Sequence, residues 1–172
     1  MRRCAECSGR RIAFASARAA VAYDGAVRAF VASWKERGLR RLAAIAADVV
    51  ANTLERPGVA VLTFVPPDGD RSRRRGHHPA ERLARELGER WELPVEPLLR
   101  RARPVKRQRG LPLAERRANV RDAFRAVATA PAKVAVVDDV YTSGATAGAA
   151  ATALRRSGTH CVSIVTFARA IR

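Results

Sequence analysis

Two adjacent carboxylates form the part of the chain whose residue types most clearly predict chemistry. Asp138 and Asp139 follow an apolar run, Val134 to Val137, that predicts a buried parallel strand. In open α/β sheets, ligands bind at the carboxyl ends of such strands. Both carboxylates are therefore expected at a ligand-binding edge, where they can accept hydrogen bonds from the vicinal hydroxyls of a sugar.

The residues that follow the aspartates predict a phosphate-binding loop. A helix is expected to begin near Ala145, and its free N–H groups, together with side-chain hydroxyls, suit a phosphate dianion. The loop and first turn consist of Thr142, Ser143, Gly144, Ala145 and Thr146. An alternative is that the aspartates only cap the next helix. The whole string favours a sugar-phosphate site.

This string resembles the phosphoribosyl-pyrophosphate (PRPP) signature of type I phosphoribosyltransferases, with Ser143 where many members have Thr. The resemblance implies that Asp138 and Asp139 are catalytic residues that hold the ribose 2′ and 3′ hydroxyls, and that residues 142–146 bind the 5′-phosphate. It also implies that Mg²⁺ accompanies PRPP, with the two aspartates as its ligands, directly or through water.

A second candidate phosphate site follows another predicted strand, at residues 59–65. The loop after this strand is rich in arginine, and the planar guanidinium group binds pyrophosphate oxygens in pairs. Arg74 and Arg75 are the expected pyrophosphate ligands, with Lys106 as a third. Lys106 belongs to a basic stretch, residues 101–111, that is interpreted as a mobile flap. The alternative for both segments is a solvated basic surface.

Apolar periodicity predicts strands and helices in alternation along most of the chain. Strands are expected at residues 17–23, 59–65, 95–98, 134–137 and 161–167, and helices at 27–38, 39–56, 79–91, 113–118 and 145–157. Such alternation implies crossover connections and a mostly parallel sheet flanked by helices. We expect an α/β fold, of the type I phosphoribosyltransferase kind by resemblance. Residues 17–172 would form that domain, after a small N-terminal hood or remnant over residues 1–16.

Composition narrows the classes of protein. The chain has 172 residues and a net charge of +17, and 30 of its 33 basic residues are Arg. A charge of this size attracts polyanions, although abundant Arg and Ala also suit a genome rich in G and C. No apolar run is long enough to span a bilayer, and no signal-peptide core follows the N-terminus. We therefore expect a cytoplasmic protein without a membrane span.

The cysteines do not predict a complete metal site. Cys4 and Cys7 form a C-x-x-C pair, but a structural zinc site needs four ligands and usually two such pairs. No second pair is present in the sequence. The pair is read as the remnant of a zinc site or as a redox-sensitive pair, and zinc is not expected.

Several short stretches resemble the ComF-like competence family, whose members carry a phosphoribosyltransferase domain. They are Tyr23–Arg28 with Lys35 and Gly38, Arg75-Gly76, spaced residues between Arg103 and Phe124, and the PRPP string. Family members usually carry two C-x-x-C pairs ahead of the domain, whereas one pair is present here.

Two functions follow from these observations. The first is a phosphoribosyltransferase that binds PRPP and Mg²⁺ and transfers the phosphoribosyl group to an unidentified nitrogen nucleophile, releasing pyrophosphate. The alternative is a non-catalytic competence or DNA-uptake protein that senses PRPP or binds single-stranded DNA. Its partners would include DNA or competence proteins, and a homodimer is compatible with either function. Few aromatic residues are available for base stacking, which leaves electrostatic binding as the route to DNA.

Overall fold

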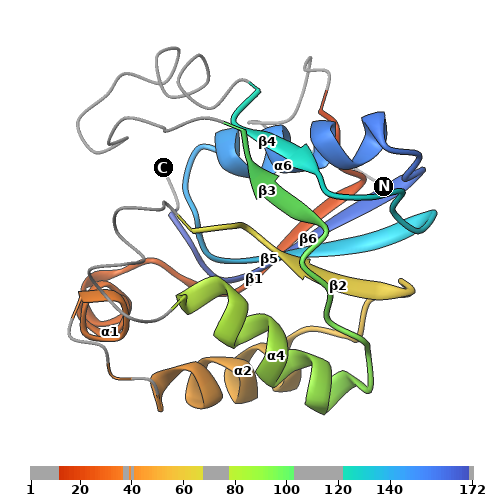
Figure 1. Ribbon diagram of the computed structural model, residues 1–172. Helices are drawn as coiled ribbons and strands as arrows, with labels where there is room; N and C mark the ends of the chain where they lie inside the picture. The colour runs from red at the N-terminus through yellow and green to blue at the C-terminus, as the bar shows by residue number, and fades with distance from the viewer. Residues whose placement is uncertain (1–11, 37–38, 40, 68–77, 103–121, 171–172) are drawn as a thin grey trace.

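In the part of the chain that the structure describes, four parallel strands form the central sheet. The structure is a computed structural model that describes residues 12–36, 39, 41–67, 78–102 and 122–170. The strands are β1 (Ser16–Ala22), β2 (Val61–Phe64), β5 (Lys133–Tyr141) and β6 (Cys161–Arg169), in the order β1-β6-β5-β2 (Figure 1). All three neighbouring pairs are parallel. The predicted α/β class with a mostly parallel sheet is thereby confirmed.

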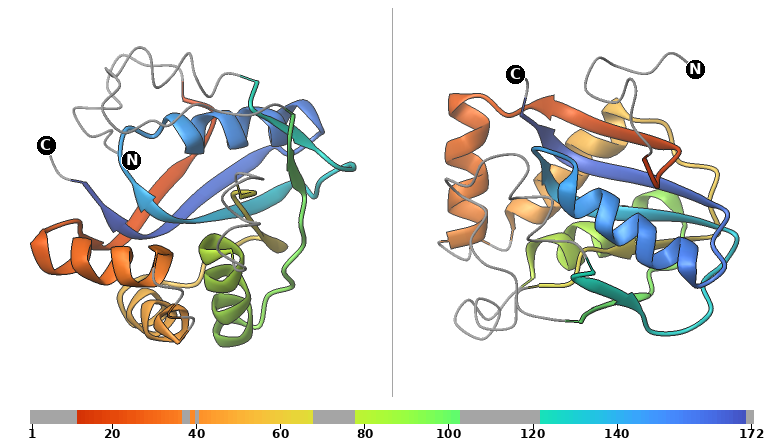
Figure 2. Two further views of the ribbon diagram at one scale, coloured as in Figure 1. Left: turned by 60° about the vertical axis from the view of Figure 1, so that its left-hand side comes forward. Right: turned by 90° about the horizontal axis from the view of Figure 1, so that it is seen from above.

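Helices cover both faces of this sheet. Helix α6 (Ala145–Arg156) lies on one face, and α1 (Gly25–Glu36), α2 (Leu42–Thr53) and α4 (Pro79–Trp91) lie on the other (Figure 2). Each helical layer closes its own apolar cluster against the sheet. Such a three-layer arrangement is the expected way to bury a parallel sheet.

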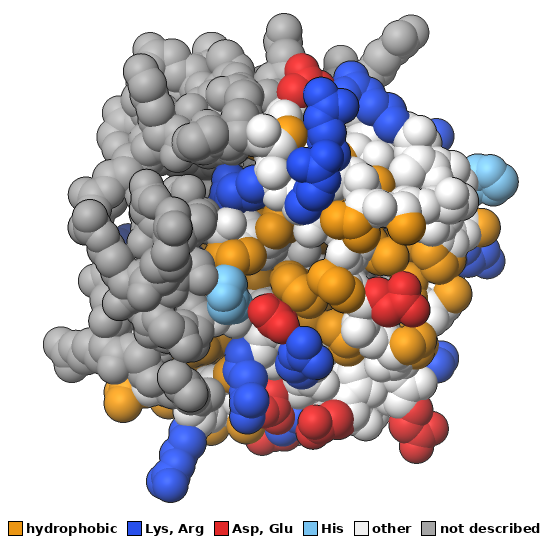
Figure 3. Space-filling model, in the orientation of Figure 1, with side chains coloured by type: hydrophobic (Ala, Val, Ile, Leu, Met, Phe, Trp, Pro, Cys, Tyr) orange, Lys and Arg blue, Asp and Glu red, His pale blue; other side chains and the backbone are white. Residues whose placement is uncertain are grey.

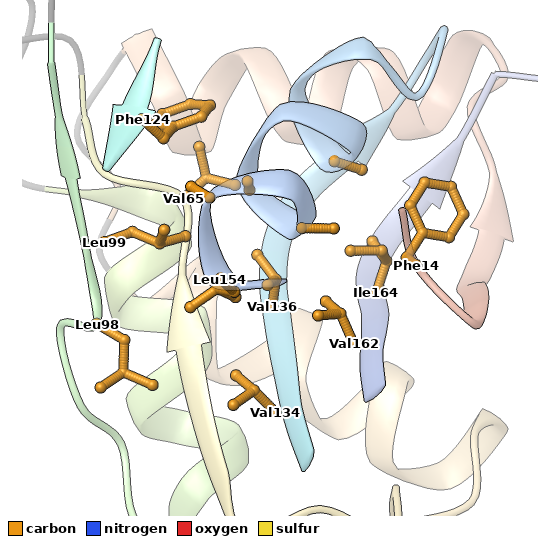
Figure 4. Packing of buried hydrophobic residues seen from close by; sticks show 14 of the residues in the cluster. Phe14, Val65, Leu98, Leu99, Phe124, Val134, Val136, Leu154, Val162 and Ile164 are labelled. Atoms are coloured by element: carbon orange, nitrogen blue, oxygen red, sulfur yellow. The ribbon is translucent and has the colours of Figure 1, made fainter. Parts of the chain in front are cut away.

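The alternation of side chains along β5 divides the core between the two layers. Val134 and Val136 belong to the cluster beneath α6, whereas Ala135 and Val137 pack with α2 and α4. Leu154 of α6 is fully buried in the first cluster, as Figure 4 shows. The same alternation decides which way the residues after Val137 face.

Helix α4 has the bounds that the sequence indicates, whereas α1 and α2 differ from the predicted ranges by a few residues. Helix α4 has Pro79 at its first position, where the missing N–H group is not needed, and ends at Glu92 in the left-handed conformation. Gly88 is required by packing, since an added Cβ would lie 2.5 Å from Val95 Cγ2 and 2.9 Å from the Leu93 carbonyl oxygen. Helix α2 begins at Leu42, three residues later than predicted.

A small antiparallel sheet stands beside the main one. It pairs β3 (Leu99–Arg101) with β4 (Phe124–Ala126). The strand predicted at residues 95–98 is wrong in position, because Val95 makes only an isolated bridge to Leu62 and the strand begins at Leu99. Pro97 explains the shift, since it has no N–H group for a ladder.

Several predicted features lie outside the described residues. They are the Cys4–Cys7 pair, Arg74, Arg75, Lys106 and the helix at 113–118. Within the part of the chain that is described, no helix is long and apolar enough to cross a bilayer.

Candidate functional site

The two aspartates lie near the carboxyl end of β5, at the centre of the sheet. Asp138 is paired in register with Thr166 of β6, and β2 borders β5 on its other side. Because neighbouring side chains of a strand point to opposite faces, Asp138 lies on the α6 side, where it lines a cavity. Asp139 meets Lys35 of α1 instead. The two adjacent carboxylates therefore lie on opposite faces of the sheet.

The cavity on the α6 side lies where β5 turns into α6. It is a small hollow that opens to solvent, and the space in it for a water-sized molecule is about 20 Å³. Its polar lining residues are Asp138, Tyr141, Thr142, Thr146 and Thr166, and Gly144 and Ala145 line it at the start of α6. Its remaining wall is mostly apolar and includes Val65, Val136 and Ile164, which Figure 4 shows beneath α6. A carboxylate thus shares one hollow with the predicted phosphate-binding loop.

Gly144 gives the loop its shape. Its φ of 70° and ψ of 4° lie in the left-handed region that glycine adopts without strain. The ring of Tyr141 packs directly against it, so a Cβ at this position would collide with the tyrosine hydroxyl. The Ser143 hydroxyl accepts a hydrogen bond of 3.4 Å from the Ala145 N–H. The first turn of α6 then presents the N–H groups that have no partner within the helix.

Neither aspartate caps α6. Asp138 Oδ1 accepts a 2.9 Å hydrogen bond from the N–H of Asp139, and Asp139 Oδ1 accepts one of 2.7 Å from the N–H of Val140. These bonds hold both carboxylates close to their own strand. The alternative that the pair merely caps the following helix is therefore wrong.

The local environment makes Asp138 hard to ionise. Burial and the nearby charge of Asp139 raise its pKa to about 7, although Lys35 acts in the opposite direction. The cavity thus contains a carboxyl group whose pKa is close to neutral pH, together with hydroxyl and N–H groups.

Lys35 forms the ion pair that completes the site on the opposite face. Its Nζ lies 2.5 Å from Asp139 Oδ2, and the two side chains are 31% and 10% exposed. Burial lowers the pKa of Lys35, but the charges of Asp139 and Asp138 outweigh it and the pKa is raised overall. Sequence reasoning did not choose Lys35 as a site residue. Two signals were available: its rarity, since the chain has three Lys and 30 Arg, and its place among the residues that resemble the ComF-like family.

The structure brings together most, but not all, of the predicted site residues. Asp138, Thr142, Gly144, Ala145 and Thr146 share the cavity, whereas Asp139 and Ser143 are not part of its lining. The proposed pyrophosphate ligands Arg74, Arg75 and Lys106 cannot be placed, because they lie outside the described residues. The described residues contain no group of three or more His, Cys, Asp or Glu side chains suited to a metal ion.

The fold and site together define an α/β protein in which a carboxylate and a loop of small and hydroxyl-bearing residues line one cavity at the carboxyl edge of a parallel sheet, consistent with a type I phosphoribosyltransferase fold. No family model matches the chain. Competence protein F of Haemophilus influenzae (strain ATCC 51907 / DSM 11121 / KW20 / Rd) is 30% identical over 142 residues, covering 80% of this chain and 62% of that protein. The chain is thus a distant homologue of Competence protein F and spans less than two thirds of its length.

A solved structure shows a weaker likeness. The crystal structure of TT1426 from Thermus thermophilus matches with a TM-score of 0.41 and 17% sequence identity. The match covers 77% of this chain and 84% of that one. A likeness this weak does not bear on function.

Proposed function

We propose that this chain is a ComF-like phosphoribosyltransferase that binds PRPP with Mg²⁺ and transfers the phosphoribosyl group to a nitrogen nucleophile. The observation that carries the proposal is one cavity, lined by Asp138 and by Thr142, Gly144, Ala145 and Thr146, at the carboxyl end of β5. Each part of a sugar phosphate has a complementary group there. The homology to Competence protein F supports the family, and the activity is inferred from the site.

The phosphate end of the ligand would lie against the start of α6. N–H groups of the first helical turn point out of a helix N-terminus, where the helix dipole also favours an anion. Gly144 lets the backbone approach closely, and Thr142 and Thr146 add hydroxyl donors. The ribose would then extend toward Asp138, whose carboxylate can accept hydrogen bonds from ring hydroxyls.

The donor set of the cavity fits Mg²⁺. This hard cation prefers oxygen ligands, retains several waters and is usually held by one or two carboxylates together with substrate phosphates. Asp138 and the threonine hydroxyls supply oxygen donors of that kind. Bound Mg²⁺ would screen the negative charge of the pyrophosphate group.

The reaction would need little covalent chemistry from the protein. The bond between ribose C1 and the pyrophosphate oxygen breaks, with the electron pair leaving on pyrophosphate. A nitrogen lone pair forms the new bond to C1, and the nitrogen then loses a proton. The protein contributes by positioning both groups and by stabilising charge, and the predicted Arg74, Arg75 and Lys106 would act on the departing pyrophosphate.

Ligand-induced thermal stabilisation tests this proposal. We expect PRPP with Mg²⁺ to raise the Tm of the wild type, because a ligand that binds only the folded state stabilises it by mass action. An Asp138→Asn/Asp139→Asn variant should lose this shift. Asp48→Asn is the matched control, because Asp48 is an exposed carboxylate that pairs with Arg90 on the α2–α4 surface. Absence of any shift at millimolar PRPP would contradict the proposal.

Catalysis is tested separately from binding. Pyrophosphate release is measured while candidate amines are added to the protein with PRPP and Mg²⁺. Amine-dependent release that is lost in the double aspartate variant would indicate transfer. Binding without release would indicate a PRPP sensor.

One observation favours single-stranded DNA binding as a second candidate function. Arg100 of β3 and Arg125 of β4 are direct cross-strand neighbours, and both are exposed. Like charges in this arrangement destabilise a sheet, so a bound anion would relieve the repulsion. Figure 3 shows basic side chains on the surface over this small sheet.

Affinity as a function of salt tests the DNA candidate. If the pair contacts phosphates, an Arg100→Gln/Arg125→Gln variant should bind a single-stranded oligonucleotide more weakly. The slope of log affinity against log salt should fall by about 1.4, at roughly 0.7 per phosphate contact. Arg82→Gln/Arg85→Gln is the control, since these arginines lie on α4 across the sheet. An unchanged slope in the Arg100/Arg125 variant would exclude this surface.

A further inference from the structure

Lys35 stands out among the described residues because it contacts the acidic pair from the side opposite the cavity. Its ammonium group lies 2.5 Å from Asp139 Oδ2, while Asp138 lines the cavity with the phosphate loop. A surface ion pair of this length would usually contribute little. The location of this pair differs from that of a surface ion pair. The Asp139 side chain is only 10% exposed, and Asp139 is adjacent to Asp138, the proposed ligand-binding residue of β5.

The helix that carries Lys35 is fixed against the sheet. Trp34, the preceding residue, is fully buried, and its ring meets that of Phe167 at 6.4 Å and 84°. Phe30 of the same helix meets Phe167 at 5.1 Å. Phe167 lies in β6 between residues that pair with Asp138 and Val140 of β5. The aromatic contacts therefore set Lys35 beside Asp139.

The partners of the Asp139 carboxylate account for both of its oxygens. Oδ1 accepts the hydrogen bond from the N–H of Val140, and Oδ2 meets Lys35. Asp138 Oδ1 accepts the Asp139 N–H, so the segment from Asp138 to Val140 is connected as one unit. Lys35 is thus linked to Asp138 through Asp139.

We propose that Lys35 is a positioning residue that holds the Asp139 carboxylate against α1 and leaves Asp138 as the carboxylate that contacts the sugar. This assignment rests on the proposed function, because it concerns the same ligand. The assignment gives different roles to Asp138 and Asp139, for which the sequence alone predicted the same role. Asp138 binds the hydroxyls, and Asp139 acts through Lys35.

The test compares two ligands that differ only in the sugar. Ribose 5-phosphate and inorganic phosphate are titrated separately, by NMR, into the wild type, Lys35→Met, Lys35→Arg, Asp139→Asn and the Lys35→Met/Asp139→Asn double variant. Lys133→Met is the matched control, since Lys133 is exposed at the opposite end of β5. Circular dichroism verifies that each variant is folded.

We expect Lys35→Met to lower the affinity for ribose 5-phosphate by about tenfold, which corresponds to roughly 1.4 kcal/mol of binding free energy. Its affinity for inorganic phosphate should stay within about twofold, because the phosphate loop lies across the strand. Lys35→Arg should restore most of the loss, and Lys133→Met should show none. Asp139→Asn should resemble Lys35→Met, and the double variant should be no weaker than either single variant.

Three results would overturn the inference. Lys35→Met could leave ribose 5-phosphate binding unchanged, or it could weaken both ligands equally, which would indicate a general structural role. Alternatively, the losses of the single variants could multiply in the double variant, which would mean that Asp139 contacts the sugar independently. Failure of the proposed function looks different. If the wild type bound neither ribose 5-phosphate nor PRPP, the proposed function would be wrong and this assignment would fall with it.

Discussion

Asp138 occupies a position that lowers the stability of the folded protein once its carboxyl group ionises. Burial and the neighbouring Asp139 raise its pKa from 3.8 to about 7. Between these two values the folded state binds a proton that the unfolded state has already released. Stability therefore falls as the pH rises through this window, and the loss is complete above about 7. Because a strongly perturbed pKa in a cavity often marks a functional residue, the Asp138 carboxyl group is a candidate functional group.

The variant Asp138→Asn should separate stability from ligand binding. Asn cannot ionise, so we expect its Tm relative to the wild type to be higher at pH 8 than at pH 4. The Tm difference should change by about 2–4 °C for each kcal/mol of destabilisation that the substitution removes. The measurement is thermal unfolding of both proteins across this pH range, with Asp48→Asn as control. A Tm difference that did not vary with pH would contradict the assigned environment of Asp138.

Gly144 and Gly148 offer a matched pair of substitutions one helical turn apart. Gly144→Ala should destabilise the protein by at least about 1–2 kcal/mol, because its φ of 70° is left-handed and Tyr141 fills the space of a Cβ. Gly148→Ala should instead stabilise it by about 0.5–1 kcal/mol, since no atom lies within 4 Å of its Cβ position. Urea unfolding measures both effects. Equal signs for the two variants would show that the loop does not have this conformation.

At the scale of elements, Arg101 connects the small sheet to the main one. Its Nε donates to the carbonyl oxygens of Pro66 and Pro67 at 3.2 and 2.8 Å, and its guanidinium lies 5.2 Å from the ring centroid of Phe124. These contacts fix β3 and β4 beside the residues that follow β2. Arg101 is therefore a structural arginine, unlike its exposed neighbour Arg100.

Removing this connection should loosen the small sheet. We expect Arg101→Gln to speed hydrogen exchange of the Ala102 and Val127 amides, which bond to Ala123 and Leu98, by about tenfold, as expected when about 1.4 kcal/mol of local stability is lost. Arg100→Gln should leave both rates within about twofold, because it removes a charge without removing an anchor. Similar rates in the two variants would show that Arg101 does not anchor the sheet.

Local sequence pattern was sufficient for the elements of the main sheet, because its signals are local. Apolar runs marked β2, β5 and β6, three- and four-residue spacing marked α1, and Pro79 marked the start of α4. The β3–β4 pair was missed, since antiparallel pairing of Leu99 with Ala126 joins residues far apart in the chain. No local period records which distant strand is the partner.

The candidate site also has a part that local sequence predicts and a part that depends on contacts between distant residues. The acidic pair and the loop to Thr146 are contiguous, and the sequence alone placed them at the carboxyl edge of the sheet. The ion pair between Lys35 and Asp139 could not be predicted, because it depends on how α1 packs across β6. Strand alternation could have indicated that Asp138 and Asp139 face opposite ways, since they are adjacent residues of one strand.

At the scale of the whole molecule, the net charge of +17 is a source of self-repulsion. Added salt shortens the distance over which charges act, from about 30 Å at 0.01 M to about 10 Å at 0.1 M. We expect the Tm to rise by a few degrees over this range of NaCl, since repulsion among the basic residues weakens in the folded state. Thermal unfolding at fixed pH is the measurement. A falling Tm would mean that attractive ion pairs, such as Arg90 with Asp48, outweigh the repulsion.

The position of the two tryptophans has a spectroscopic consequence. Trp34 and Trp91 are both buried in the layer of α1, α2 and α4, across the sheet from the cavity. Their emission should therefore be blue-shifted, and an anion that occupies only the α6 side should leave it unchanged. Because Trp34 directly precedes Lys35, its fluorescence lifetime should respond to events at the ion pair. The protein thus carries a built-in optical probe that distinguishes arrival of a phosphate from movement of α1.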